Sequence, residues 1–272
     1  MSDVKQKILF VNSEIYPYLP ETPISRIGRY LPQGVQEHKR EIRSFMPRFG
    51  CINERKNQLH EVIRLSGMNL IISDIDRPLI IKVAYISSAR VQVYFIDNED
   101  YFCRKQIFCD DNGAFFPDND ERAIFFARGV LETVKKLRWA PDIIHCQGWI
   151  SHLVPVYLKK AYKDDPIFAS SKIVLSLYDD TPEVDFSQDF AQKACFGPVV
   201  REDVSLLEKA TGINLARTAV QYSDGIILGS GNIKEDIVSY AGQLGLPILP
   251  YDGEALENGA YVDDYCAFYD KI

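Results

Sequence analysis

The sequence lacks long hydrophobic runs and paired cysteines, and these absences exclude several classes of protein. No apolar stretch approaches the ~18–20 residues of a membrane span, and the apolar run near the start is too short for a signal peptide. The 6 cysteines include no C-x-x-C pair, and the 4 histidines are too dispersed for a zinc site. We therefore expect a cytoplasmic protein that binds no membrane, with reduced thiols, no metal ion and no cofactor.

Positive charge is also scarce. Lys and Arg total 31 against 38 Asp and Glu, which gives a formal net charge of -7, and no block of basic residues offsets it. Nucleic acids and anionic membrane surfaces both attract basic proteins, so the sequence predicts neither as a partner.

What the chain does contain is the pattern of an α/β protein. Its 272 residues are 46% hydrophobic and 25% charged, which is typical of a folded chain with one large domain or two small ones. Short apolar runs alternate with segments of helical periodicity. The predicted strands are residues 7–11, 41–46, 91–96, 143–146, 173–177 and 225–228. The predicted helices lie near residues 25–39, 121–138, 149–162, 204–209, 215–222, 233–240 and 262–269.

This alternation predicts a mostly parallel sheet of about six or seven strands with helices on both faces. We expect a single domain over residues 1–272, with an acidic, turn-rich tail at 242–272 that packs on it. Residues 60–88 depart from the alternation, because two β-like runs at 62–72 and 79–84 flank the polar segment 73–78. They predict an inserted antiparallel hairpin.

Polar residues at strand ends mark candidate binding positions. The first apolar run ends in Asn12-Ser13-Glu14, and ligands of open α/β sheets gather at the carboxyl ends of their strands. Ser13 and Glu14 are therefore candidates, with ordinary loop hydrogen bonds as the alternative. Ser230 lies between Gly229 and Gly231 and suggests a phosphate-binding turn, although a lone G-x-G is a weak signal.

Several segments, in order along the chain, resemble bacterial glycogen and starch synthases. The matching segments are residues 7–18, 46–50, 93–98, 117–126, 139–146, 153–159 and 222–224, together with Trp149. The resemblance implies a Rossmann-like domain, the amino-terminal half of the two-domain glycosyltransferase fold called GT-B. It also implies that a second domain holds most of the ADP-glucose contacts, and we expect the chain to end about where that domain would begin.

The chain departs from the family pattern at its active-site motifs. Where the family has a phosphate-binding K-x-G-G loop, this chain reads LPETPI at residues 19–24; Glu21 repels phosphate and two prolines remove N–H donors. The family's H-D-W-H loop corresponds to residues 147–150, where Ile150 replaces the second histidine. A further His-Asn pair falls on Tyr178-Asp179 or on Asp179-Asp180.

What the resemblance preserves is Asp118-Asn119, which it implies to be a sugar-binding pair; the alternative is a helix cap. Trp149 is either a stacking platform for a sugar or a core residue. We assign no catalytic residue. The substrate-binding candidates are Ser13, Glu14, Asp118, Asn119, Gln147, Trp149, Asp179 and Ser230.

Two functions follow from the resemblance and its departures. The first is a glycogen or starch synthase-like domain that binds a sugar or an α-glucan without glucosyl transfer of its own, or acts with a partner. The alternative is an active ADP-glucose-dependent α-glucan glucosyltransferase, completed by a separate second domain. A Rossmann-like module unrelated to sugars would need a glycine-rich turn after the first strand, which Asn12-Ser13-Glu14 does not supply.

The carboxyl edge of the sheet also predicts an association surface. The apolar residues expected near it are Tyr16, Tyr18, Trp149, Ile150, Tyr178 and Phe186. A large apolar patch is uncommon on a soluble monomer, so we expect this face to be buried in a homodimer, against a partner protein, or under the chain's own 179–200 segment and tail.

Overall fold

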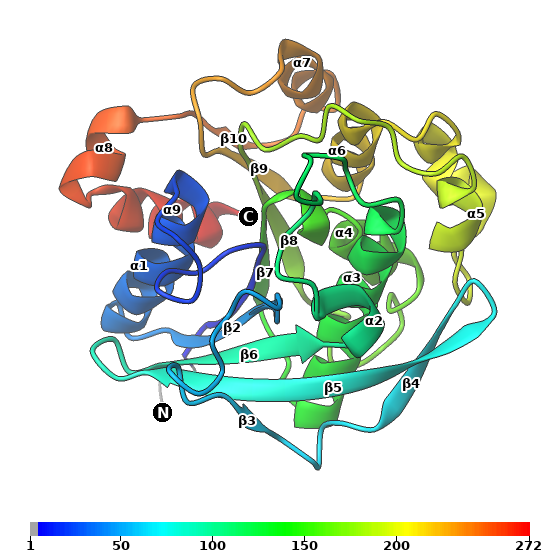
Figure 1. Ribbon diagram of the computed structural model, residues 1–272. Helices are drawn as coiled ribbons and strands as arrows, with labels where there is room; N and C mark the ends of the chain where they lie inside the picture. The colour runs from blue at the N-terminus through cyan, green and yellow to red at the C-terminus, as the bar shows by residue number, and fades with distance from the viewer. Residues whose placement is uncertain (1–4) are drawn as a thin grey trace.

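The computed structural model describes residues 5–272 and contains one mixed sheet of 10 strands in the order β10-β9-β8-β7-β1-β2-β6-β5-β3, with β4 paired to β5 (Figure 1). The strands are β1 (Lys7–Asn12), β2 (Glu41–Pro47), β3 (His60–Glu61), β4 (Met68–Ile72), β5 (Ile75–Ile86), β6 (Val91–Asp97), β7 (Ile143–Gln147), β8 (Lys172–Leu177), β9 (Gly225–Leu228) and β10 (Ile248–Leu249). The strands from β10 to β6 in this order are all parallel, which confirms the prediction of a mostly parallel sheet.

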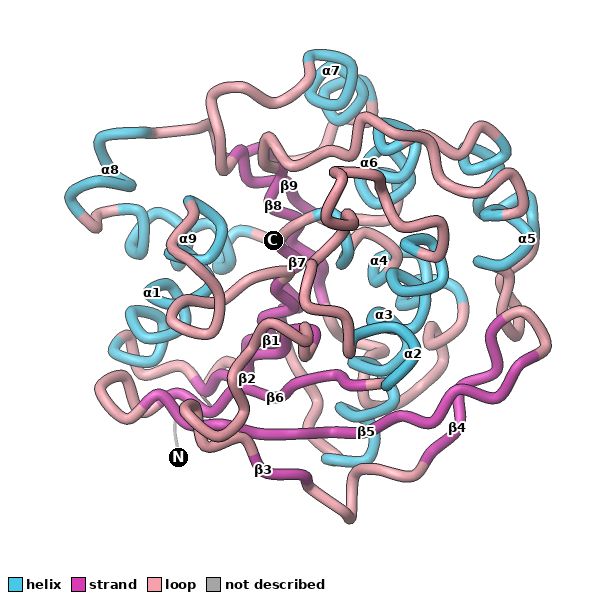
Figure 2. The backbone as a smooth tube through the Cα atoms, in the orientation of Figure 1, coloured by secondary structure: helices cyan, strands magenta, loops and turns pink. Residues whose placement is uncertain are grey.

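Helices connect the strands and cover both faces of the sheet (Figure 2). The α-helices are α1 (Pro23–Glu37), α2 (Glu99–Phe102), α3 (Asn119–Leu137), α4 (Val154–Lys160), α5 (Phe190–Ala194), α6 (Gly212–Gln221), α7 (Glu235–Gln243), α8 (Gly253–Asn258) and α9 (Tyr261–Lys271). The described residues also form two short 3-10 helices, η1 (Trp149–Ser151) and η2 (Arg201–Glu208). No helix within residues 5–272 is long and apolar enough to cross a bilayer.

The inserted hairpin exists, but its boundaries differ from the prediction. β4 and β5 are joined by a tight turn at Ser73-Asp74, and both residues have a left-handed backbone, with φ of 49° and 62°. The polar stretch up to Pro78 therefore belongs to β5, while residues 62–65 form a turn. Proline is tolerated in this strand because residues 75–79 pair only with β4 and lie at a sheet edge.

The core has two parts, one on each face of the sheet. The larger part packs α3, α4 and α6 against one face, and the smaller part packs α1 and α9 against the other. The smaller core joins Ile8 and Phe10 of β1 to Tyr265 and Phe268 of α9. Figure 1 shows α1, α8 and α9 together on the side of the sheet opposite α3 and α4. Residues of the tail thus form one wall of the interior.

The carboxyl edge of the sheet is covered by the chain itself. Of the six residues predicted for an apolar patch there, Tyr16 is half-buried and the other five are buried, so most of that patch does not face solvent; the five are Tyr18, Trp149, Ile150, Tyr178 and Phe186. The ring of Phe186, from the 179–200 segment, lies 5.5 Å from the ring of Trp149. Of the three covers considered for this face, the structure contains the chain's own 179–200 segment.

This covering segment is held by ion pairs to the start of α3. Lys193 Nζ lies 3.1 Å from Asp120 Oδ2 and 3.3 Å from Glu121 Oε1, and the Ser187 hydroxyl also donates to Asp120. Asp120 is fully buried. Because breaking a buried ion pair leaves an uncompensated charge, these contacts fix the segment firmly over Trp149.

Candidate functional site at the carboxyl edge of the sheet

The sheet reverses its strand order between β1 and β7, and the crevice at such a reversal is where open α/β sheets bind ligands. From β1 the chain runs to β2 on one side, whereas β7, β8 and β9 follow one another on the other side. Asn12 lies opposite Gln147 in the β1–β7 register, and Ser13 N donates to Gln147 O at 2.9 Å. The turn after β7 therefore meets the turn after β1.

Gly148 makes this close approach of the two turns sterically feasible. Its backbone has φ 82° and ψ 149°, a combination open almost only to glycine. A β-carbon at this position would lie 2.0 Å from Ser13 Oγ. Ser13 is buried beneath the turn, and its hydroxyl finds no hydrogen-bond partner among the described residues.

We expect Gly148→Ala to lower the free energy of unfolding by about 2 kcal/mol, because the new methyl group both strains the backbone and displaces Ser13. Urea unfolding at constant pH measures the loss. Gly113→Ala is the matched control, since Gly113 also has φ 82° but nothing lies within 4 Å of its β-carbon position. If both variants lost the same free energy of unfolding, the contact between the new methyl group and Ser13 would not contribute to the loss.

Two carboxyl groups flank this turn. Glu14 Oε2 accepts a hydrogen bond from Thr22 Oγ1 at 2.6 Å, and burial raises the pKa of Glu14. Asp180 Oδ2 accepts from the Trp149 backbone N–H at 2.8 Å. Burial, with a smaller contribution from the nearby Glu14 carboxylate, raises the pKa of Asp180 to about 6, although the hydrogen bond from the Trp149 N–H acts in the opposite direction. Two acidic side chains and no basic side chain thus bond to the groups around this turn.

The carboxyl that bonds to this turn belongs to Asp180, the neighbour of the predicted candidate Asp179, whose role in substrate binding stays a prediction. Asp179 is exposed, whereas the Asp180 side chain accepts a hydrogen bond from the backbone N–H of Trp149, in the turn after β7. The two neighbouring aspartates carry no signal in the sequence that distinguishes them. Only the path of the chain after β8 selects the second one.

The loop before α1 does not form an anion site. Pro23, the first residue of the helix, has no N–H, and Ser25 N donates to Thr22 Oγ1 at 3.0 Å. Ser25 Oγ in turn accepts from Thr22 N at 2.8 Å, so the capping box is complete. Glu21 adds a negative charge, and the nearby Arg26 is paired with it at 3.3 Å. A diphosphate would find few donors and a repelling carboxylate here.

Four of the predicted site residues lie in the interior: Ser13, Asn119, Gln147 and Trp149. Gln147 Nε2 donates to Asn12 Oδ1 at 2.9 Å, and its Oε1 accepts from Tyr178 Oη at 3.0 Å. The Trp149 ring lies 4.6 Å from Phe108, inside an aromatic cluster. These four side chains have almost no exposed surface, because they pack against or hydrogen-bond with neighbouring segments of the chain.

The Asp118-Asn119 pair fixes a loop to the start of α3. Asp118 does not cap the helix with its side chain; it accepts two hydrogen bonds from Arg104, at 2.7 and 2.5 Å. Asn119 Nδ2 donates to Phe108 O at 2.8 Å, and its Oδ1 accepts from Arg122 at 2.6 Å. Both side chains thus hold the loop before α3, and only Asp118 keeps some exposed surface.

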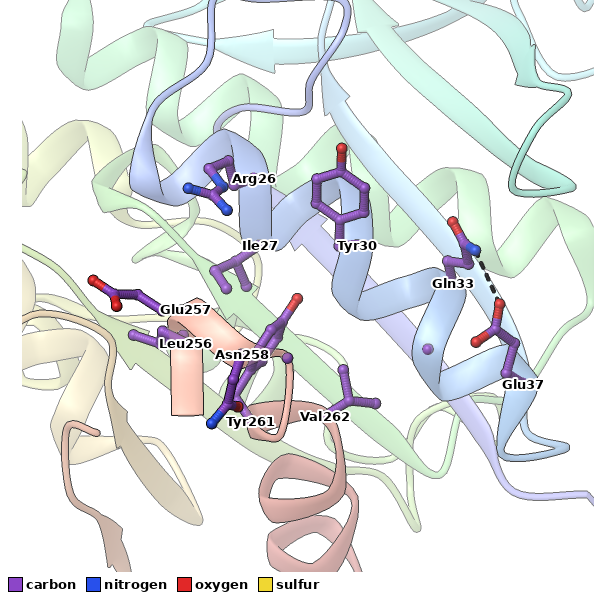
Figure 3. A pocket seen from close by; sticks show the side chains of 12 residues that line it. Arg26, Ile27, Tyr30, Gln33, Glu37, Leu256, Glu257, Asn258, Tyr261 and Val262 are labelled. Carbon is purple, nitrogen blue, oxygen red and sulfur yellow. Dashed lines mark hydrogen bonds between the residues drawn. The ribbon is translucent and has the colours of Figure 1, made fainter. Parts of the chain in front are cut away.

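Ser230 lines a cleft of about 900 Å³ between the start of α1, the 229–232 loop and residues 251–257. Ser230 Oγ accepts from Asn232 N at 3.1 Å, a bond within its own turn. No helix begins directly after the turn, since α7 starts at Glu235. A second cavity of about 380 Å³ continues between α1 and α8–α9 (Figure 3).

Metal-binding clusters are not part of this site. Within residues 5–272 no group of three or more His, Cys, Asp or Glu side chains could hold a metal ion. The chemistry available at the crevice is thus that of two carboxyls, hydroxyls and amides, which suits hydrogen bonding to hydroxyl groups.

Comparison with known proteins identifies the family. Residues 7–249 match the family model described as "Starch synthase catalytic domain". The chain belongs to this family. The starch synthase resemblance predicted from the sequence is therefore confirmed, and the match ends before α8, so residues 250–272 lie outside it.

Curated relatives of this starch synthase-type domain are glycogen synthases. The chain is 34% identical over 235 residues to a glycogen synthase of Chlorobium limicola, covering 85% of this chain and 47% of the relative. It is 35% identical over 227 residues to one of Chlorobium luteolum, covering 82% and 45%. The chain thus spans about half the length of the curated relatives it matches.

A solved structure supports the fold. The catalytic domain of Starch Synthase IV from Arabidopsis thaliana, bound to ADP and acarbose, aligns with a TM-score of 0.73 at 13% sequence identity. The alignment covers 90% of this chain and 51% of that chain. The shared α/β architecture is that of one half of the larger protein.

Proposed function

We propose that this starch synthase-type domain binds a neutral sugar or an α-glucan at the carboxyl edge of its sheet and transfers no glucosyl group by itself. The observation that carries the proposal is the pair of carboxyls, Glu14 and Asp180, beside the turn after β7. The donors of the loop before α1 are already bonded within the capping box of that helix. Carboxyls bind sugar hydroxyls well but repel the diphosphate of a nucleotide sugar. The likeness to a domain solved with ADP and acarbose supports a carbohydrate ligand.

The lost polar groups support the absence of transfer. Ile150, which replaces the second histidine of the family's loop, is fully buried and offers no donor. Each donor missing from a transition-state site costs on the order of 10²-fold or more in rate. Several such losses together are expected to lower the rate of glucosyl transfer by the 272-residue chain to that of the uncatalysed reaction.

The test incubates the purified 272-residue chain with radiolabelled ADP-glucose and glycogen, and measures glycogen binding in parallel by affinity electrophoresis. We expect retarded migration in glycogen-containing gels and no incorporation of label above a blank. Incorporation that survives repurification and is abolished by Asp180→Asn would overturn the inactive part of the proposal. Migration unaffected by glycogen or maltooligosaccharides would overturn the binding part.

A second candidate is an ADP-glucose-dependent glucosyltransferase completed by a separate domain. It is favoured by one observation, that the glycogen synthase relatives are about twice as long as the matched region. Co-purification with a protein that carries a nucleotide-sugar domain, together with transfer by the mixture alone, would favour this candidate. The chain could also associate with a second copy of itself, and the molar mass from light scattering on the same sample tests for this homodimer.

A further inference from the structure

The cleft beside Ser230 and the cavity between α1 and α8–α9 form one groove. Both cavities are lined by Arg26, Ile27, Leu256 and Glu257, so they meet along the same stretch of α1. One wall of the groove is α1 and the other is formed by residues 251–262, of which Figure 3 shows the part from Leu256 to Val262. The second wall follows residue 249, where the family match ends. One wall of the groove therefore lies outside the region that the family model matches.

The α1 wall presents one continuous stripe of side chains. Arg26, Tyr30, Gln33 and Glu37 are spaced by four, three and four residues, which places them on one face of the helix. At 1.5 Å per residue the stripe is about 16 Å long. Gln33 Nε2 donates to Glu37 Oε1 at 2.9 Å, as the dashed line in Figure 3 shows. The groove is longer than a single hexose ring.

Exposed aromatic rings lie in both parts of the groove. Three tyrosines within residues 5–272 are largely exposed: Tyr30 (45%), Tyr85 (56%) and Tyr251 (44%). Tyr30 lines the cavity between the helices and Tyr251 lines the cleft, while Tyr85 lies on β5 and lines neither. Large exposed rings that line a concavity are typical of ligand sites.

Both groove tyrosines are held in place. β-Carbons at Gly231 and Gly253 would lie 3.4 Å from Tyr251 Cε1 and 3.1 Å from Tyr251 Oη, so the ring rests against two glycine backbones. The Arg29 guanidinium lies 5.0 Å from the centroid of the Tyr30 ring. Rings that are already fixed lose little entropy when a flat apolar surface stacks on them.

The charge of the groove excludes phosphorylated ligands. The charged residues that line it are one arginine, Arg26, and three glutamates. Arg26 is paired with one of these glutamates, Glu21; the other two are Glu37 and Glu257. The other polar groups are amides and hydroxyls, such as those of Asn232, which bond to hydroxyls of a neutral ligand.

We propose that this groove binds a segment of α-glucan, with Tyr30 and Tyr251 as stacking platforms. A hexose ring has an apolar C–H face that packs on an aromatic ring and a polar rim that bonds to planar side chains. The proposal rests on the proposed function, that the domain binds a glucan, and adds the surface on which a chain of several glucose units lies.

The test is calorimetric titration of the full 272-residue chain with maltoheptaose. We expect Tyr30→Ala and Tyr251→Ala each to weaken binding about tenfold, which corresponds to about 1.4 kcal/mol. Tyr85→Ala is the matched control and keeps wild-type affinity, because it removes an equally exposed ring from β5. All three side chains are on the surface, so circular dichroism melts should match the wild type.

The outcomes separate the two proposals. Wild-type affinity in both groove variants overturns the groove but leaves glucan binding at the Glu14–Asp180 crevice. A wild-type chain that binds no maltoheptaose overturns both. Equal affinity for cellohexaose, whose chain is straight, overturns the assignment to α-glucan. Tight binding of ADP that is lost in Tyr251→Ala overturns the neutral-ligand assignment.

Discussion

Deletion of residues 250–272 is expected to abolish cooperative unfolding, although the remaining chain contains the whole region matched by the starch synthase family model. The deletion removes four buried aromatic side chains of α9, namely Tyr261, Tyr265, Phe268 and Tyr269. Burying each is worth about 1.5–3 kcal/mol, so the loss is on the order of 10 kcal/mol, as large as the whole stability of a typical domain. The deletion also exposes Ile8 and Phe10 of β1 to water.

A polar contact adds to this cost. Tyr269 Oη lies 2.7 Å from Nδ1 of His145, a residue without any exposed surface, and the truncation leaves that nitrogen without this partner. Urea titration followed by near-UV circular dichroism and by binding of a hydrophobic dye measures the effect. We expect a sloping, non-cooperative signal and strong dye binding in the truncated chain.

Asp270→Ala is the control for the truncation. It removes the ion pair with Arg40, in which the Asp270 side chain is 61% exposed, and surface pairs are worth about 1 kcal/mol or less. A truncated chain with a sharp transition at the wild-type urea midpoint would contradict the prediction. It would mean that α8 and α9 lie on the surface of a core complete without them.

Asp180→Asn is expected to stabilise the protein at neutral pH by about 3 kcal/mol and to flatten its pH dependence. Folding raises the pKa of this carboxyl from 3.8 to about 6, and each pKa unit corresponds to about 1.4 kcal/mol. Between these two values the folded chain binds more protons than the unfolded chain, so the free energy of unfolding falls as pH rises. The stability contributed by the protonated carboxyl is present below about pH 4 and is lost above about pH 6.

The measurement is urea unfolding of the wild type and the variant across this pH range. The variant should match the wild type near pH 4 and exceed it at neutral pH, because an asparagine oxygen still accepts the Trp149 N–H without a buried charge. Asp179→Asn is the matched control and should change the pH dependence far less, since Asp179 is exposed and its charge is the last of the causes that raise the pKa of Asp180. If the free energy of unfolding depended on pH in the same way for the wild type and Asp180→Asn, the Asp180 carboxylate would not destabilise the folded protein.

A destabilising carboxyl at a strand-order reversal is also informative about function. Perturbed pKa values gather at binding and catalytic sites, where a group serves a ligand at the expense of stability. Asp180 shares its crevice with Glu14, so the stabilised variant should bind glucan more weakly at that crevice. The same variant thus connects the stability measurement with the proposed function.

The sequence by itself determined the fold class and the family. Strands such as Lys7–Val11 are short apolar runs that end in polar residues, and α3 carries its apolar residues at helical spacing, so local patterns suffice to define them. The departures at Glu21 and Ile150 were also visible, because a charge or an apolar side chain in a motif position changes its chemistry wherever the chain places it.

Only the tertiary structure decided which side chains face the crevice. Trp149 and Asn119 were candidates for sugar contact, with a core position and a helix cap as the alternatives. In the structure, Phe186 packs against the ring of Trp149, and Asn119 Nδ2 donates to Phe108 O. Asp180 was separated from Asp179 by the direction in which the chain leaves β8. Burial depends on what the rest of the chain packs above a residue, and no local pattern records that. The sequence predicted a helix near residues 262–269 in the tail, but only the structure shows that this helix, α9, closes one half of the core.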